Sequence, residues 1–269
     1  MTGSDAPSRL LIEIAGLGVA LNCEDEEFAR LVAGAYSSFL ALPGTPVACE
    51  FAVHIAPPRG TDPDEDVRVS LADGKWQIRR GDFEAEFDPR ARQGWVRHTA
   101  NPYSVDTVLR IVHTLLAADA GGFLVHAAGA ILNGRGLILA GASGAGKTTM
   151  CRLAPPDAVL LSDEICYVMR HGEEYLVHGT PFAGELGIPG VKVSAPAAAL
   201  YLLARGNQHR LVPLKPAEAA RQLLRCILFF AEDAELAGKV FNSACEFVRR
   251  TPVYRLEFQP EPGVWELLK

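Results

Sequence analysis

The stretch of sequence with the clearest chemical content is GASGAGKTT, at residues 141–149. Its first eight residues match G-x-x-x-x-G-K-[ST], the pattern of a phosphate-binding P-loop. An aliphatic run precedes it and a helix-like run follows it, as such a loop requires. Glycines let successive backbone N–H groups turn inward around phosphate oxygens, and the N-terminus of the following helix adds partial positive charge. The stretch therefore predicts a site for the phosphates of a nucleotide.

Within this loop, two side chains have distinct expected roles. The ammonium of Lys147 would contact the β- and γ-phosphates, and the hydroxyl of Thr148 would bind Mg²⁺. The alternative is a glycine-rich turn between a strand and a helix that binds nothing, which the complete pattern in this context disfavours. The predicted nucleotide-binding residues are Gly141, Ala142, Ser143, Gly144, Ala145, Gly146, Lys147, Thr148 and Thr149.

Two adjacent acids follow the loop. Asp163 and Glu164 end the run VLLSDE, 16 residues after Lys147, which leaves room for one short helix and a strand beside the loop-bearing strand. One acid could hold Mg²⁺ while the other accepts a proton from an attacking hydroxyl. Both could instead be solvated residues at a strand end. Next to a P-loop we favour the catalytic interpretation.

A histidine precedes the loop. His126 lies in the apolar run FLVHAAGAIL, 15 residues before Gly141. A lone histidine in such a run is usually a core residue with satisfied hydrogen bonds. Here two consecutive strands and a tight turn at NGRG would return the chain alongside itself, so His126 could approach the same phosphate end. We therefore include His126 among the catalytic candidates, with Asp163, Glu164 and Lys147.

Taken in order, these residues resemble the HPr kinase/phosphorylase family, whose catalytic domain is similar to phosphoenolpyruvate carboxykinase. The family pattern is a His-bearing strand, a hairpin, a strand leading to G-x-S-G-x-G-K-[ST], a short helix and a strand that ends in two acids. The matching segments are LVHAAGAILNGRGLILAGASGAGKTT and AVLLSDE. The segment HGTPFAGELG resembles the one that supplies a metal-binding glutamate, which would be Glu185. The resemblance covers roughly residues 100–260.

The resemblance implies an ATP-dependent kinase that transfers the γ-phosphoryl group to a hydroxyl of a peptide, a protein or a small molecule. The implied Mg²⁺ ligands are Thr148, Asp163 and Glu185. The implied proton acceptor is Glu164, where the HPr enzymes have aspartate; the added methylene moves the carboxylate by about 1.5 Å. The glycine-rich basic segment that contacts HPr is missing after Glu185, so HPr itself is not the expected acceptor. The family's members form hexamers, so a homo-oligomer is compatible with the resemblance.

Other functions remain open at this point. The chain could be a non-catalytic nucleotide sensor or adaptor that binds a partner chain, while carboxykinase-type chemistry on an acidic metabolite is disfavoured because those enzymes are much longer. Several downstream arginines are candidate transition-state cations, although each could be a solvated charge on a helix face. They are Arg205, Arg221, Arg225, Arg249 and Arg250.

The expected fold is α/β, a mixed-sheet P-loop domain of HPr kinase or phosphoenolpyruvate carboxykinase type with a smaller β-rich N-terminal region. Residues 1–100 form that region, for substrate or partner binding, with a hairpin at Asp73-Gly74. Residues 101–269 form the catalytic domain, which opens with a helix capped by Ser104. We also expect a helix within 25–41, a polar loop at 55–66, a helix over 147–154, one strand over 157–170, and helices over 216–230 and 234–250.

Composition narrows the setting. The 269 residues include 26 Lys and Arg against 32 Asp and Glu, a net charge of −6 without a dense basic cluster, so we expect no nucleic-acid partner. The most apolar stretch, residues 121–142, is interrupted by polar residues and predicts no membrane span. The N-terminal residues lack a secretory-signal pattern. Six widely spaced cysteines without metal-site spacing predict free thiols and a cytoplasmic location.

Overall fold

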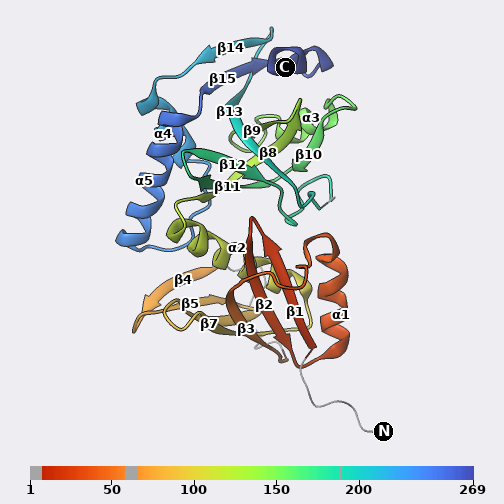
Figure 1. Cartoon of the computed structure of the whole chain (residues 1–269), viewed down its shortest axis with the longest axis vertical. Coiled ribbons are helices and arrows are strands. Elements are labelled where there is room, and N and C mark those ends of the chain that lie inside the picture. The colour runs from red at the N-terminus through yellow and green to blue at the C-terminus, as the bar shows by residue number, and fades with distance from the viewer. Residues whose placement is uncertain (1–7, 58–65, 188) are drawn as a thin grey trace. The chain divides into compact units, whose positions relative to one another are not determined.

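The computed structural model describes residues 8–57, 66–187 and 189–269. The chain divides into two compact units, each with its own β-sheet (Figure 1). Unit 1 comprises the chain up to Leu116 together with Phe229–Ala234, and unit 2 comprises Ala117–Leu228 and Glu235–Lys269. Helices accompany mixed sheets, so the expected α/β class is confirmed at this level. The polar loop expected at 55–66 falls largely outside the described residues.

Unit 1 contains a seven-stranded sheet in the order β1-β2-β3-β7-β6-β5-β4. The β2–β3 and β3–β7 pairs are parallel and the others are antiparallel. The elements are β1 (Ser8–Ile14), β2 (Leu17–Cys23), α1 (Glu26–Ala35), η1 (Ser37–Phe39), β3 (Val47–Ile55), β4 (Arg68–Ala72), β5 (Lys75–Arg80), β6 (Phe83–Asp88) and β7 (Gln93–His98).

Local sequence signals explain two elements of this unit. Asp73 and Gly74 join β4 to β5 with positive φ angles of 51° and 76°, as a tight hairpin turn requires, so this prediction is confirmed. Helix α1 begins after Asp25, whose carboxylate accepts the backbone N–H of Phe28 at 2.7 Å. Phe28 and Val32 are buried on one face of that helix, which also confirms the expected helix within 25–41.

Helix α2 (Pro102–Asp119) is predicted by its sequence, but its start differs from the expectation. Ser104 lies inside the first turn and is not the cap. Its hydroxyl donates a 3.0 Å hydrogen bond to Asp82 in the β5–β6 turn, so it ties the helix to the sheet. Asp82 also accepts from the Arg80 guanidinium at 2.6 and 3.0 Å. Ser104 therefore donates its hydroxyl to the carboxylate of Asp82 and does not cap the helix.

Unit 2 contains eight strands. They follow the order β10-β8-β11-β12-β13-β15-β14, and β9 pairs with both β13 and β8. The strands are β8 (Phe123–Leu132), β9 (Arg135–Ala140), β10 (Val159–Ser162), β11 (Ile165–His171), β12 (Glu174–His178), β13 (Ser194–Arg205), β14 (Arg210–Pro213) and β15 (Val253–Phe258). The helices are α3 (Lys147–Arg152), α4 (Pro216–Leu224), α5 (Ala234–Arg250) and η2 (Pro262–Leu268).

Two of the expected helices in unit 2 are shorter than predicted. The helix expected over 147–154 ends at Arg152, and the helix expected over 216–230 ends at Leu224. The second difference has a clear cause, because the chain beyond Leu224 supplies hydrogen bonds to β8. The His126 N–H donates to the carbonyl of Cys226 at 2.7 Å, and the Leu228 N–H donates to that of Leu124 at 2.9 Å. Helix α5 matches its predicted bounds.

The strand expected over 157–170 is also corrected. It is two strands, β10 and β11, separated by Asp163 and Glu164. We expected the strand that ends in these acids to lie beside the loop-bearing strand β9, but β10 pairs with β8. One edge of β9 is occupied by β8 through the Asn133-Gly134 hairpin, and the other edge by β13, so β10 could pair only beyond β8.

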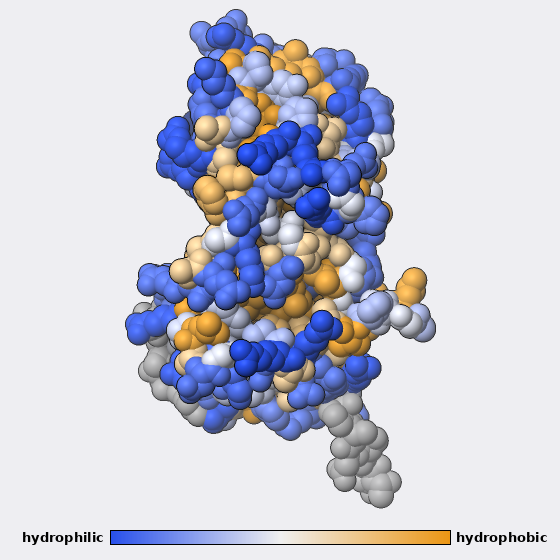
Figure 2. Space-filling model, turned by 60° about the vertical axis from the view of Figure 1, so that its left-hand side comes forward, coloured by the Kyte–Doolittle hydropathy of each residue, from blue (hydrophilic) through white to orange (hydrophobic). Residues whose placement is uncertain are grey.

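The surface drawn in Figure 2 is mostly hydrophilic, with apolar side chains scattered over it. In the part of the chain that the structure describes, no helix has the length and apolar character needed to cross a membrane.

All six cysteines are free thiols, as the sequence predicted, and four of them are buried.

Replacement of Asp82 by Asn tests the link between α2 and the sheet. The Asp82 side chain is only 10% exposed, and we expect Asp82→Asn to lower the free energy of unfolding by about 2 kcal/mol at pH 7. Burial alone would raise the pKa of Asp82, but the hydrogen bonds from Arg80 and Ser104 outweigh it and lower the pKa. Because the pKa of Asp82 is lower in the folded state, the ionised carboxylate stabilises the fold at pH values above the unfolded pKa of about 3.9. This stability is lost as the pH falls through the folded-state pKa.

Urea unfolding at pH 7 and at pH 3 measures this difference. Asp73→Asn is the control, because Asp73 occupies an exposed turn with positive φ that Asn also adopts. An equal loss in both variants, or a loss for Asp82→Asn that stays undiminished in acid, would contradict the assignment.

Candidate functional site

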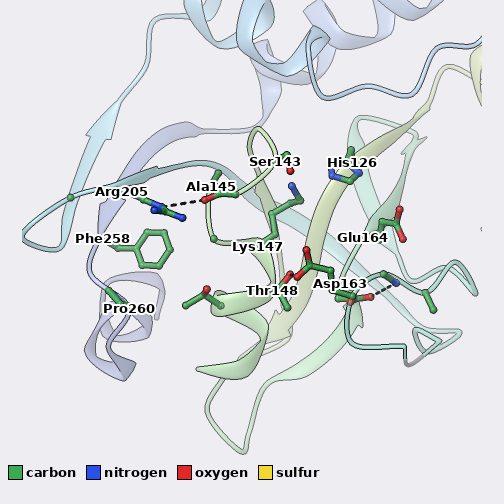
Figure 3. Close-up of a pocket in the computed structure, with 17 residues that line it drawn as sticks. His126, Ser143, Ala145, Lys147, Thr148, Asp163, Glu164, Arg205, Phe258 and Pro260 are labelled. Carbon is green, nitrogen blue, oxygen red and sulfur yellow. Dashed lines mark hydrogen bonds between the residues drawn. The ribbon is translucent and has the colours of Figure 1, made fainter.

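The glycine-rich loop lines one side of a cavity of about 890 Å³ in unit 2 (Figure 3). Strand β9 leads into the loop and α3 leaves it, as the sequence predicted. Gly146 has a φ of 109°, and a Cβ there would lie 2.6 Å from the Phe258 ring, so only glycine fits. Because α3 has six residues, its dipole is short, and the loop amides add to the positive potential that an anion would meet.

Lys147 reaches across its own loop. Its ammonium donates to the carbonyl of Gly141 at 3.0 Å and to that of Ala142 at 3.4 Å. Burial lowers the pKa of Lys147, while Cys226, Glu185 and Glu164 act in the opposite direction. The two carbonyls therefore hold the ammonium within its own phosphate loop.

The two adjacent acids occupy the connection between β10 and β11. The Ser162 hydroxyl accepts the backbone N–H groups of Glu164 and Ile165, both at 3.1 Å, and so stabilises the break between the strands. The Glu164 carbonyl accepts the N–H of Ala127 at 2.9 Å, and Ile165 is the register partner of His126. Backbone pairing thus places Glu164 next to His126 at the edge of the cavity (Figure 3).

Asp163 anchors the segment that carries Glu185. One oxygen of its carboxylate accepts the N–H of Gly184 and the other accepts that of Leu186, both at 2.9 Å, and the residue is 8% exposed. A Cβ on Gly184 would lie 2.8 Å from the Asp163 carboxylate, so the close approach requires glycine. Glu185 in turn accepts a 2.9 Å hydrogen bond from the Thr148 hydroxyl. Asp163 therefore acts on the site by positioning Glu185 against Thr148.

Most of the predicted site residues are brought together. The catalytic candidates His126, Lys147, Asp163 and Glu164 line the cavity, as do Glu185 and residues 143–149. Gly141 and Ala142 do not line it and contribute only the carbonyls that hold Lys147.

Among the five downstream arginines, Arg205 lines this cavity, and its guanidinium donates to the carbonyl of Gly144 at 3.3 Å. The residues found to line the cavity include none of Arg221, Arg225, Arg249 and Arg250. Arg250 instead forms ion pairs with Glu173 and Glu246. Of these five arginines, Arg205 is therefore the one that lies within reach of a ligand in this cavity.

Sequence reasoning missed the wall formed by Gly206, Phe258 and Pro260. Strand β13 runs parallel to β9 and to β15, so the carboxyl ends of all three strands meet at one edge. Ligands bind at such edges in open α/β sheets. The parallel pairing of β13 with β9 and with β15, which brings Arg205 and Phe258 to this edge, was not predicted.

Protein side chains alone do not form a metal site in the part of the chain that the structure describes. Over residues 8–57, 66–187 and 189–269, no three His, Cys, Asp or Glu side chains are grouped to hold a metal ion. Thr148 and Glu185 nevertheless present two adjacent oxygen ligands. Such a pair suits a cation that takes most of its ligands from phosphate and water.

A family model described as SynChlorMet cassette protein ScmC matches residues 99–269, which is 171 of the 269 residues. The chain belongs to the ScmC family. Every residue that lines the cavity lies within the matched segment, whereas the seven-stranded sheet of unit 1 precedes it. A search of curated proteins found no match to the sequence.

Asp163→Asn tests the anchoring role. An amide can accept one of the two backbone N–H groups but presents its own NH₂ to the other, so one hydrogen bond is lost. We expect hydrogen exchange at the amides of Gly184 and Leu186 to accelerate by about tenfold, while amides of β13 are unaffected. Asp157→Asn, in the exposed turn before β10, is the matched control. Unchanged protection in Asp163→Asn would show that the carboxylate does not hold this segment.

Proposed function

We propose that this protein is an ATP-dependent kinase, similar to HPr kinase, that transfers the γ-phosphoryl group of ATP to a hydroxyl on a peptide, a protein or a small molecule. One observation carries the proposal. The phosphate-loop residues 143–149 and the carboxylates of Asp163, Glu164 and Glu185 line the same cavity, although up to 42 residues separate them in sequence. A structural turn would not require acids to gather opposite it.

The cavity suits a nucleotide donor. Its volume of about 890 Å³ lies within the range of roughly 300–1,000 Å³ that is typical of small-molecule sites. The loop amides would bind the phosphate oxygens, and Lys147 would exchange its hydrogen bonds to the loop carbonyls for bonds to phosphate. Arg205, which already contacts the loop, would add a second cation.

The same residues fit Mg²⁺. Thr148 and Glu185 would hold it through hard oxygen atoms, with Asp163 fixing the position of Glu185. When bound, Mg²⁺ supplies neutralisation of the charge on the donor phosphates. A metal held in this way needs one or two protein ligands, so the absence of a larger acidic group among the described residues agrees with it.

Glu164 is the proposed proton acceptor. Both oxygens of Asp163 accept backbone N–H groups and hold the segment of Glu185, so we assign the role of base to the adjacent Glu164, which also lines the cavity. Its carboxylate would take the proton of the acceptor hydroxyl while the oxygen of that hydroxyl bonds to the γ-phosphorus and the bond from the γ-phosphorus to ADP breaks. His126, which lies beside Glu164 in the cavity, would orient the acceptor hydroxyl (Figure 3).

Lys147→Ala tests the donor site. Loss of the ammonium should weaken binding of ATP with Mg²⁺ by about 100-fold and abolish transfer, because it removes a charge-assisted contact to phosphate. Calorimetric titration measures the binding. Lys215→Ala, which changes an exposed lysine before α4, should bind ATP like the wild type. Equal affinity in Lys147→Ala and the wild type would rule out the loop as the phosphate site.

Glu164→Gln separates chemistry from binding. Gln keeps the size of the side chain but cannot accept the proton, so we expect nearly normal ATP binding and a loss in transfer rate of about 10²- to 10⁴-fold. The measurement is incorporation of label from γ-labelled ATP into proteins, peptides and small molecules of an extract of the source organism. Glu174→Gln, at the start of β12, is the control.

The outcomes of this second experiment are distinct. Normal transfer by Glu164→Gln would show that another group is the base. If the wild type binds ATP and Mg²⁺ but labels nothing, the protein is a nucleotide sensor or adaptor.

A further inference from the structure

Unit 2 contains a second cavity, of about 540 Å³, whose lining residues differ from those of the phosphate-loop cavity. Strand β11 runs between the two cavities. It begins at Ile165, directly after Glu164, and carries Arg170 near its other end. The extended strand spans about 20 Å from Glu164 to Arg170, so the second cavity is a separate site.

The β11–β12 hairpin and helix α5 form the walls of this second cavity (Figure 1). Arg170 on β11 is the register partner of Tyr175 on β12, so both side chains lie on the same face of the sheet. The Tyr175 ring meets the Phe247 ring of α5 edge-on, with 5.1 Å between the ring centres, so α5 covers this face. Ser243 lies about one helical turn before Phe247 and faces the same way. Arg170, Tyr175 and Ser243 all line the cavity.

Two hydroxyl groups of this lining belong to buried residues. Tyr175 is 3% exposed and Ser243 is 8% exposed. Neither hydroxyl makes a hydrogen bond to another residue that the structure describes. Burial and the nearby Glu246 raise the pKa of Tyr175, so its hydroxyl is protonated at neutral pH and can donate. Buried polar side chains in folded proteins nearly always have a hydrogen-bond partner, and a molecule bound in the cavity would supply one to both hydroxyls.

Two arginines that line the cavity keep most of their N–H groups available. Arg170 donates its Nε–H to a turn carbonyl at 2.9 Å, and its nearest carboxylate oxygen, on Glu173, is 3.8 Å away. Arg249 lies 3.9 Å from Glu246. Both distances exceed that of a hydrogen bond. The two glutamates accept hydrogen bonds from Arg250 instead, so the forks of Arg170 and Arg249 can bind a ligand.

The chemistry of these groups selects a ligand rich in acceptor oxygens. Guanidinium groups only donate, hydroxyl groups can donate, and the lining carboxylate of Glu246 is already bonded to Arg250. Carboxylate and phosphate groups accept such hydrogen bonds, and a guanidinium fork can bind either in bidentate geometry. Phe241, which is half exposed, lines the same cavity and adds apolar surface for an organic group.

We propose that this cavity binds a small organic anion whose carboxylate or phosphate group contacts Arg170, Arg249 and the hydroxyls of Tyr175 and Ser243. Its volume of about 540 Å³ lies within the range of roughly 300–1,000 Å³ that is typical of small-molecule sites. All of these residues lie in the segment that the ScmC family model matches. The site shares no lining residue with the phosphate-loop cavity, so it does not depend on the proposed kinase function.

Phenyl phosphate and phenylacetate test the site, because they join the same ring to a phosphate or to a carboxylate group. We expect calorimetric titration of the full chain at low salt to show binding of at least one of them, weakened by added salt. Arg170→Gln with Arg249→Gln should lower the affinity at least about tenfold. Arg135→Gln with Arg210→Gln, at the exposed starts of β9 and β14, removes the same charge and should leave the affinity unchanged.

Two further variants, Tyr175→Phe and Ser243→Ala, remove the hydroxyl groups and keep the packing of the Tyr175 ring on Phe247. No hydrogen bond within the described chain is lost, so each variant should keep an unlowered thermal midpoint without ligand. Each should nevertheless bind the same anion about tenfold more weakly, because a hydrogen bond to a charged group is lost. A lowered midpoint with unchanged affinity would show that the hydroxyls are structural and would contradict the proposal.

The remaining outcomes are distinct. Binding of neither anion would show that the cavity holds only water, and equal affinity in the Arg170 and Arg135 variant pairs would place the anion elsewhere; either result overturns the proposal. So would binding that is lost in Lys147→Ala but kept in the Arg170 pair, which would place the anion at the phosphate loop. Loss of ATP binding in Lys147→Ala bears on the kinase proposal and leaves this one intact.

Discussion

Strand β8 hydrogen-bonds to three other strands, and this pairing fixes the parts of the large cavity that are far apart in sequence. Its C-terminal half pairs with β9 on one side and β10 on the other, and its N-terminal half pairs with β11. Ala127 is the register partner of Ala140 on β9, and its backbone N–H donates to the carbonyl of Glu164. Strand β8 therefore has the phosphate loop at one edge and the two acids at the other. His126, one residue earlier, lies between them. A shift of one residue in this register would turn His126 into the core, because side chains alternate between faces.

Parallel pairing builds the opposite wall. Strands β9, β13 and β15 all run in one direction, and each ends at the cavity, with the loop after Ala140, with Arg205 and with Phe258. Arg205 and Phe258 are register partners, so they reach the edge together. The Phe258 ring then lies against Gly146, which makes the close packing of the last strand one reason why the loop needs a glycine at that position. The C-terminal strand therefore contributes to the shape of the phosphate loop.

The sequence predicted well whatever depends on neighbours along the chain. The hairpin turns at Asp73-Gly74 and at Asn133-Gly134 have positive φ, as their Asp-Gly and Asn-Gly sequences predict. The loop residues and the approach of His126 followed from one motif and one hairpin. No local motif indicates which strands pair when they are distant in sequence, so the position of β10 beyond β8 was not predicted. The end of α4 was missed for a related reason. The sequence after Leu224 has a helical pattern, but the backbone carbonyl of Cys226 accepts a hydrogen bond from β8 instead of continuing the helix.

The charge of the large cavity bears on how a phosphate donor would bind there. The large cavity is lined by Asp163, Glu164 and Glu185 against Lys147 and Arg205, so its charged side chains sum to one negative charge. A polyphosphate would add several more, which backbone amides alone cannot offset, so we infer that a phosphate donor enters this cavity together with a divalent cation.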